Sequence, residues 1–519
     1  MRFNSNHLNR ELDCLIGTLQ ERYAGSLRAV GGYDGPMLAS RLAQRVLEIS
    51  HAAYARAAGL RLPADNAGPL LPLTPMFCPG ANVYAGGAIR ITVPLSVWMK
   101  AQAVFVAHWV YCLGSILFPQ MAGRGATETT LVYGVGEESL FQEGNDHAFV
   151  EFCDKGPVAP LQRVRLLVQS SQPARASSSS RFSYWRNPLT VLIRTTAIGF
   201  AARMRLLAVH IALLPRWLLA SAQAPELSLL ARDFPYTGMV RALDRAGILR
   251  DIVCTISSYG SQPLWMRGLS HTKVHMVWYA QNWKPIRWMD EPLDSDIVEL
   301  PHIAVDAHWV WTHSFAAYLS TLLPKAACHV VGPLLWYLPV SVQRPTDVIS
   351  ISVFDVPPYA DAVALAYGEF PNYNHPRNLF AFIRDVLALA TRLKAELGVQ
   401  AVVSLKTKRG YNAAYDRPYF DHLESLAAQG QIRLRHHSTN LYSMIVDSHL
   451  VLAYPFTSPA YVAAHLGVPA IYHDPTGAIL RQDFSDLPDG LPFTSSGQAL
   501  FEEAKALLGK HGEIAGNWR

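Results

Sequence analysis

The strongest constraint on the fold is a regular alternation of short apolar runs with helical patterns, which occurs twice along the chain. The first series occupies residues 237–333 and the second residues 347–508, with the proline-containing segment 339–346 between them. Strands that alternate with helices favour a parallel sheet covered by helices on both faces. The sequence therefore predicts an α/β protein with two Rossmann-like domains whose strand ends face a cleft, the place where such folds bind ligands.

The chain of 519 residues is too long for one hydrophobic core. We expect three regions. Residues 1–125 form a mostly helical N-terminal extension, residues 126–338 the first Rossmann-like domain, and residues 339–519 the second. Short apolar runs at 129–136 and 164–168 add strands to the first domain.

Composition narrows the class of protein. Hydrophobic residues make up 50% of the chain and charged residues 16%, which excludes a disordered or fibrous protein. The net charge of +5 is too small for a dedicated nucleic-acid binder. Six cysteines without a CxxC pair, and an N-terminus without an apolar leader, favour a reduced, cytoplasmic compartment.

The basic residues are unevenly distributed. Residues 155–224 contain one lysine and nine arginines but no acidic residue. Within this segment, the Leu- and Trp-rich stretch 187–219 is interrupted by arginines, which suits the anionic face of a cytoplasmic membrane. A helix buried on one side, with arginine stems lying along its surface, is the alternative. A second apolar stretch, 93–118, predicts a buried pair of helices, with peripheral membrane contact as the alternative.

Three cations follow a strongly apolar run in the second series. The segment Ser404-Leu-Lys-Thr-Lys-Arg409 places Lys406, Lys408 and Arg409 at the carboxyl end of a predicted strand. Ligands bind where parallel strands end, and clustered cations suit a phosphate. A solvated loop is the alternative.

A second anion-binding pattern lies further along the chain. The run Ala453-Tyr-Pro-Phe-Thr-Ser458 leads from a strand into Thr457 and Ser458, which open a helix with Pro459 in its first turn. Hydroxyls and free N–H groups at a helix N-terminus favour an anion, although a simple helix cap explains the same residues. A polar turn containing Ser438 is a further candidate for contact with a nucleotide.

These residues carry a resemblance to a known family. The order strand, Phe-Thr-Ser-Pro, helix, Leu-Gly-Val-Pro, strand resembles the donor-binding half of GT-B glycosyltransferases. The run Tyr454–Ser458 resembles the signature of bacterial polysaccharide-biosynthesis proteins named for a PFTS motif. Segments 279–286 and 308–312 are also similar to such proteins, and the resemblance covers residues 129–480.

The resemblance implies a GT-B-like enzyme that transfers a nucleotide-activated sugar during capsule, lipopolysaccharide or O-antigen assembly. It implies a CMP-linked ulosonic-acid donor as cosubstrate, a glycan or lipid-linked acceptor, and peripheral association with the cytoplasmic membrane face. The implied nucleotide-binding residues are Lys406, Lys408, Arg409, Ser438, Tyr454, Thr457 and Ser458. A His-Pro pair like that of some sialyltransferases occurs at His375-Pro376. The lone Asp294-Ser-Asp296 lies in a predicted loop, so we expect no metal.

Catalysis needs a carboxylate or histidine that faces the donor from the first domain. Glu138, after a glycine-rich strand end, and Asp233, before a predicted helix, are the first candidates. Tyr279, Asn282 and Lys284 follow a buried strand and are candidates for contact with the sugar or the acceptor.

Other functions share these features. A transferase that uses a UDP- or GDP-linked donor, or a sugar-nucleotide epimerase, would have the same architecture and anion site. The arginine-rich segment argues against an epimerase, because a soluble substrate needs no membrane surface. A non-catalytic assembly platform is a further alternative, and hydrolysis of a donor separates it from an enzyme.

Overall fold

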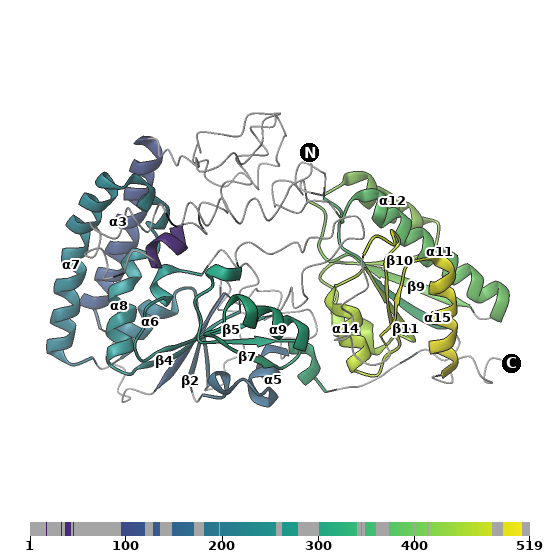
Figure 1. The fold of residues 1–519 in the computed structure, drawn as a ribbon, viewed down its shortest axis with the longest axis horizontal. Coiled ribbons are helices and arrows are strands. Elements are labelled where there is room, and N and C mark those ends of the chain that lie inside the picture. Colours follow the sequence, from purple (N-terminus) through teal and green to yellow (C-terminus); the bar gives the residue numbers. More distant parts are fainter. Residues whose placement is uncertain are drawn as a thin grey trace.

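The protein is described here from a computed structural model, drawn in Figure 1. It describes residues 17, 33, 37–42, 45, 95–119, 128–134, 148–163, 165–170, 181–196, 198–255, 262–278, 300–339, 344, 348–359, 373–398, 400–412, 415–479 and 491–510. Most of the predicted helical extension 1–125 lies outside these residues. Its described parts include a helical stretch at 37–42 and a long helix, α3 (Leu95–Leu117).

The first sheet has seven strands, all paired in parallel. They are β1 (Thr129–Tyr133), β2 (Arg165–Gln169), β3 (Phe182–Trp185), β4 (Leu249–Cys254), β5 (Lys273–Val277), β6 (Ala307–Val310) and β7 (Ala327–Val330). Their spatial order is β3-β2-β1-β4-β5-β6-β7. This is the Rossmann order, in which the direction of chain progress reverses between the first and fourth strands.

The second sheet repeats the same order with six parallel strands, β10-β9-β8-β11-β12-β13. They are β8 (Ile349–Phe354), β9 (Ala401–Lys406), β10 (Arg433–Arg435), β11 (Leu450–Ala453), β12 (Ala470–His473) and β13 (Phe493–Thr494). Here the order reverses between β8 and β11. Two tandem Rossmann-like sheets confirm the α/β fold predicted from the two series.

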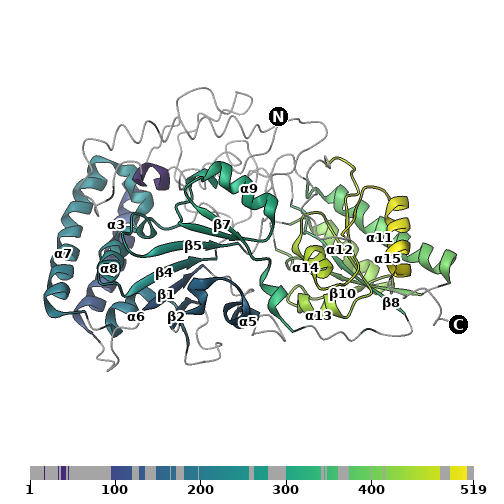
Figure 2. The same ribbon diagram turned by 60° about the horizontal axis from the view of Figure 1, so that its bottom comes forward.

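Helices cover both sheets, which lie side by side in Figures 1 and 2. The first sheet is accompanied by α5 (Ala148–Lys155), α6 (Pro188–Thr195), α7 (Phe200–Gln223), α8 (Phe234–Arg245) and α9 (His313–Leu322). The second is accompanied by α11 (Pro376–Leu397), α12 (Arg417–Ala428), α13 (Leu441–Val446), α14 (Ser458–His465) and α15 (Gly497–Lys510). A 3₁₀ turn, η8 (Leu334–Tyr337), follows the first sheet.

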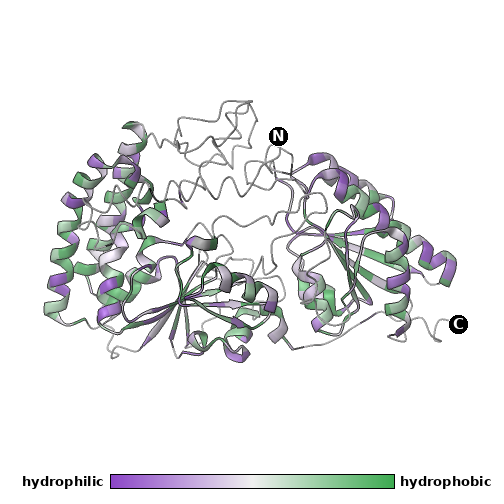
Figure 3. Cartoon of the chain, viewed as in Figure 1, coloured by the Kyte–Doolittle hydropathy of each residue, from purple (hydrophilic) through white to green (hydrophobic). Residues whose placement is uncertain are grey.

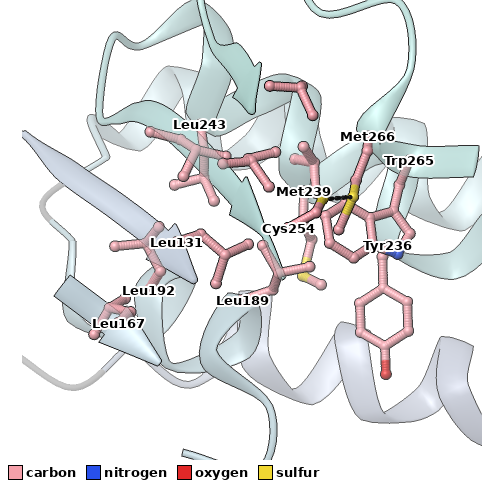
Figure 4. Packing of buried hydrophobic residues seen from close by; sticks show 14 of the residues in the cluster. Leu131, Leu167, Leu189, Leu192, Tyr236, Met239, Leu243, Cys254, Trp265 and Met266 are labelled. Carbon is pink, nitrogen blue, oxygen red and sulfur yellow. Dashed lines mark hydrogen bonds between the residues drawn. The ribbon is translucent and has the colours of Figure 1, made fainter. Parts of the chain in front are cut away.

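Each sheet has an apolar core on both faces, because successive residues of a strand point to opposite sides. In β1, Leu131 packs into the cluster under α6 and α8, drawn in Figure 4, whereas Val132 packs into the cluster with Phe149 and Phe152 of α5. Strands buried on both faces read as continuous apolar runs, which is why they were visible in the sequence.

Several helix ends follow directly from local residues. The Thr312 side chain accepts a hydrogen bond from the N–H of Phe315 at the start of α9, and Asn440 caps α13 in the same way. Gly398, with φ of 68°, ends α11 in the left-handed conformation that glycine adopts without steric cost.

The structure corrects one prediction. The stretch 93–118 is not a buried pair of helices, because α3 continues through Gly114 as one helix. Phe105 and Cys112 on this helix are buried, but Leu95 and Met99 are 71% and 59% exposed. Glycine in a helix costs only about 1 kcal/mol, which packing against α7 and α8 offsets.

Helices α3, α6, α7 and α8 pack together as a group beside the first sheet (Figure 2). Within the described part of the chain, α7 alone is long and apolar enough to span a membrane by length and composition, and 33% of that stretch is buried. Figure 3 shows hydrophobic and hydrophilic residues interspersed along it. One side of α7 is held in the domain, since Trp217 stacks on Phe105 at 4.7 Å between ring centroids.

Candidate functional site

The two anion-binding patterns lie on one edge of the second sheet. Strand pairing sets Lys406, Phe354 and Ala453 opposite one another on β9, β8 and β11. The loops that follow these residues therefore leave the sheet together, at the point where the strand order reverses. Only β8 separates the cationic loop from the Tyr454–Ser458 turn, which places the two about 10 Å apart. Sequence reasoning placed both at strand ends but could not show that they are neighbours.

The cationic loop presents its charges to solvent. Lys406 is half-buried at the end of β9, whereas Lys408 and Arg409 are exposed. The Thr407 hydroxyl donates to the carbonyl of Arg409 at 2.9 Å, which closes the loop into a tight turn. Gly410 lies so close to the His437 ring that a Cβ would come within 2.8 Å of it. The turn after β10 therefore packs against this loop.

Ser438 belongs to that neighbouring turn. Its hydroxyl lies 2.6 Å from Nδ1 of His436, and the side chain is exposed. The structure thus brings the predicted Ser438 beside the cationic loop rather than elsewhere on the surface.

The Tyr454–Ser458 turn is held in a strained conformation. Phe456 has φ of +58°, and it is the one residue other than glycine with a positive φ among those described. The Thr457 hydroxyl donates to the Tyr454 carbonyl at 2.7 Å, and the Tyr472 hydroxyl donates to the Thr457 carbonyl at 2.5 Å. Bulky residues reach positive φ only where their surroundings enforce it, and such strain clusters at functional sites.

This turn differs from the predicted helix cap. Thr457 occupies the N-cap position of α14, but its hydroxyl bonds the carbonyl of Tyr454 and makes no cap hydrogen bond. Ser458 is half-buried in the first helical turn. The N–H groups that open α14 are thus not capped by a side chain, as an anion site at a helix N-terminus requires.

Tyr454 is a core residue. Its side chain is buried, packs on the rings of Tyr373 and Phe382, and donates to the Tyr373 carbonyl at 2.9 Å. Burial raises the pKa of its hydroxyl above the usual value. Its direct contribution is to anchor the turn, and the predicted contact with a nucleotide remains a proposal.

Sequence reasoning missed Asp355, which directly follows β8 at the reversal point. The carboxylate is 2% exposed and accepts a hydrogen bond of 2.5 Å from the Tyr419 hydroxyl. Burial raises its pKa to about 7, against the opposing effects of that hydroxyl, the Lys408 backbone and the Lys406 charge. An acidic residue at the end of an apolar strand was the available signal.

A pocket of about 440 Å³ lies between the two domains. The carboxyl ends of β6 and β7 and η8 form one wall, and Tyr461 and His465 of α14 form the other. The Tyr461 hydroxyl donates to the Trp311 carbonyl at 3.1 Å, and the Tyr461 ring stacks on Trp336. The helix that begins at Ser458 therefore contacts the strand ends of the first domain.

The segment 308–312 builds part of this contact. It forms β6 and the cap of α9, and its His308 is fully buried, with a pKa that burial lowers to about 4. His308 accepts from the indole N–H of Trp278, so its place in the motif is structural.

Of the site residues predicted in the first domain, the structure describes Asp233 but not the other four. Asp233 lines a cavity of about 800 Å³, and its Oδ2 accepts from Nε of Arg41 at 3.2 Å and from the N–H of Leu264 at 2.8 Å. Glu138, Tyr279, Asn282 and Lys284 lie outside the described residues.

The His-Pro pair lies at the start of a helix. His375 caps α11, and its Nδ1 accepts from the N–H of Arg377. Within the described ranges there is no group of three His, Cys, Asp or Glu side chains that could hold a metal. Asp294 and Asp296 lie outside those ranges, so metal independence stays a prediction.

Two tandem Rossmann-like domains, in which α14 of the second domain contacts the strand ends of the first, have the architecture of GT-B glycosyltransferases. A sequence profile described as "polysaccharide biosynthesis PFTS motif protein" matches residues 211–502. The chain belongs to this family, as the run Tyr454–Ser458 predicted. No curated protein matches it.

Solved structures give remote similarities. The wall teichoic acid polymerase TagF aligns with 10% identity and a TM-score of 0.38 over 82% of this chain and 93% of that chain. Sucrose-phosphate synthase from Thermosynechococcus elongatus aligns with 10% identity and a TM-score of 0.41, over 76% and 92%. MurG of Acinetobacter baumannii aligns with 9% identity and a TM-score of 0.32, over 75% and 91%. Values this low say nothing about substrate.

Proposed function

We propose that this protein is a glycosyltransferase that moves a sugar from a nucleotide-linked donor onto a surface polysaccharide or a lipid-linked glycan. The observation that carries the proposal is the shared strand-end edge of the second domain. There the cationic loop and the uncapped start of α14 lie one strand apart. Cations and free backbone N–H groups within that span suit the phosphate of a nucleotide.

The proposed donor carries a CMP-linked ulosonic acid. Its support is the sequence resemblance together with a site built from cations and hydroxyls, namely Lys406, Lys408, Arg409, Ser438, Thr457 and Ser458. A UDP- or GDP-linked donor is the alternative, and it would occupy the same edge.

We assign the catalytic carboxylate to the first domain, with Asp233 and Glu138 as candidates. Asp233 is supported by its place in the wall of a large cavity at the carboxyl edge of the first sheet. Its Oδ2 is engaged by Arg41 and Leu264, so Oδ1 is the atom available to accept a proton from an acceptor hydroxyl.

Peripheral membrane contact through α3 and α7 completes the proposal. Phe200, Leu219 and Ile211 of α7 are 79%, 61% and 52% exposed. Arg205 and Arg216 of the same helix add positive charge, which anionic lipid attracts. A helix with one side in the domain core and apolar side chains on the other suits a position in the membrane interface.

Thermal-shift titrations test the donor site. We expect CMP to raise the melting temperature more than UDP, GDP or ADP, and expect Lys406→Ala and Ser458→Ala each to weaken binding about tenfold. Lys505→Ala removes an exposed cation on α15 and is the matched control, with binding unchanged. A shift with UDP or GDP that both variants weaken would replace the donor. No shift with any nucleotide would refute the donor site.

A further inference from the structure

A cavity of about 800 Å³ opens at the carboxyl ends of the first three strands of the first sheet. Tyr133, Gln169 and Arg186, at or just beyond the ends of β1, β2 and β3, form its floor. Other lining residues come from α3, from the start of α8 and from the 3₁₀ turn η6 (Leu264–Met266). Tyr236 of α8 and Trp265 of η6 belong to the apolar cluster shown in Figure 4. The strand-end edge on which it lies continues through β6 to the contact with α14.

The cavity is strongly cationic. Five basic side chains line it: Arg41, Arg45, Lys100, Arg186 and Arg232. Among the described residues that line it, Asp233 is the one carboxylate, and it pairs with Arg41. Within the described part of the chain, Lys100 and Arg232 have no acidic partner. A concave site lined by Lys100 and Arg232 favours an anion.

The neutral polar side chains of the cavity are hydrogen-bonded to one another. The Tyr236 hydroxyl lies 2.8 Å from Nδ1 of His108 and accepts from the Asn187 amide at 2.9 Å. Burial and the nearby Arg232 charge lower the pKa of His108, which favours its neutral form. His108 and Asn187 therefore add hydrogen-bonding groups without adding negative charge.

Helix α3 connects this cavity with the exposed apolar surface. Val97, Lys100 and Val104 face the cavity, whereas Met99, Val106 and Val110 on the same helix are exposed to solvent. The neighbouring helix α7 also carries exposed apolar residues, among them Val209 and Ile211. A ligand that fits both features carries an anionic group and an aliphatic chain.

We infer that the cavity binds the phosphate group of a lipid-anchored acceptor, with the lipid chain leaving along α3 toward the membrane. The inference deepens the proposed function by naming the chemical class of the acceptor, and it rests on that function. Guanidinium groups match phosphate oxygens in pairs, which favours phosphate as the anion. The acceptor glycan then lies on the same strand-end edge that reaches α14.

Vesicle binding by the full chain tests the inference. The probe is hexadecyl phosphate in phosphatidylcholine vesicles, compared with phosphatidylserine vesicles of equal surface charge. We expect a preference for the phosphate vesicles of about tenfold or more. Lys100→Ala and Arg232→Ala should each remove about tenfold of that preference. Arg205→Ala, an exposed cation of α7 outside the cavity, should weaken binding to both vesicle types alike.

Soluble probes separate the sources of phosphate. We expect inorganic phosphate and glycerol phosphate to bind much more weakly than the vesicles. If they bind as tightly, and Lys100→Ala and Arg232→Ala weaken them equally, the ligand is a soluble phosphate and the lipid part of the inference is wrong. If neither variant changes any of these affinities, the cavity is not the site. Thermal shifts with nucleotides, measured on Lys100→Ala and Arg232→Ala, test the donor site separately. Loss of these shifts would contradict the proposed function rather than the inference about the cavity.

Discussion

A buried carboxylate at the strand-end edge of the second sheet, where the strand order reverses, predicts a specific dependence of stability on pH. Burial raises the pKa of Asp355 to about 7, whereas in the unfolded chain its carboxyl titrates near the ordinary value of 3.8. Its contribution to stability is therefore fully present below about pH 4 and is lost as the pH rises through about 7. The resulting decrease in the free energy of unfolding is a few kcal/mol at most.

The variant Asp355→Asn tests this, because an amide keeps the acceptor for the Tyr419 hydroxyl but does not ionise. We expect urea unfolding at pH 5 and pH 8 to show that the wild type loses stability relative to the variant as the pH rises. Parallel pH dependence of the two proteins would show that Asp355 does not ionise over this range.

The two sides of helix α7 differ in burial, and we expect them to differ in what they contribute to stability. The buried side holds the helix, since Trp217 stacks on Phe105 and donates to Oε1 of Gln102 at 2.6 Å. We expect Trp217→Ala to cost about 3–5 kcal/mol in the free energy of unfolding. Leu219→Ala, on the exposed side, should change it by less than about 0.5 kcal/mol. Equal losses would mean that the exposed side is also packed.

The exposed side should serve membrane contact. We expect Leu219→Glu to weaken co-sedimentation with phosphatidylglycerol vesicles roughly tenfold or more, because burial of a leucine contributes about 1.5–3 kcal/mol. The melting temperature should remain unchanged, which separates this effect from unfolding. Unchanged sedimentation would place the membrane contact elsewhere, and Leu219→Ala serves as the milder control.

The elements that sequence reasoning found and missed differ in a physical way. Central strands such as β1 and β11 are buried on both faces, so their apolar runs are unmistakable. The edge strand β3 (Phe182–Trp185) is short and half-buried, and β13 has two residues, so neither produces such a run. The two anion-binding patterns of the second sheet could be predicted, because each lies in a loop that directly follows an apolar strand. The cationic cavity could not, because it joins α3 to strand ends and to α8, and this contact leaves no local signal.

The molecule as a whole consists of two units with separate cores. The clusters around the first sheet comprise residues 112–331, and the main cluster of the second comprises residues 349–508. Among the described residues, contact between the units comes mainly from α14, η8 and a small cluster around Tyr442 and Leu338. Interfaces of this kind couple domains weakly.

We therefore expect calorimetry of the full chain to show two transitions. Leu131→Ala removes a fully buried side chain from the first core and Leu405→Ala one from the second, each at a cost of about 2–5 kcal/mol. Each variant should lower a different transition. A nucleotide that binds at the proposed donor site should raise the temperature of the transition that Leu405→Ala lowers. It should leave the temperature of the other transition unchanged, because a ligand stabilises the unit that holds it. A single transition that both variants lower equally would instead mean that the two sheets unfold as one cooperative unit, and nucleotide binding would then stabilise the acceptor cavity as well.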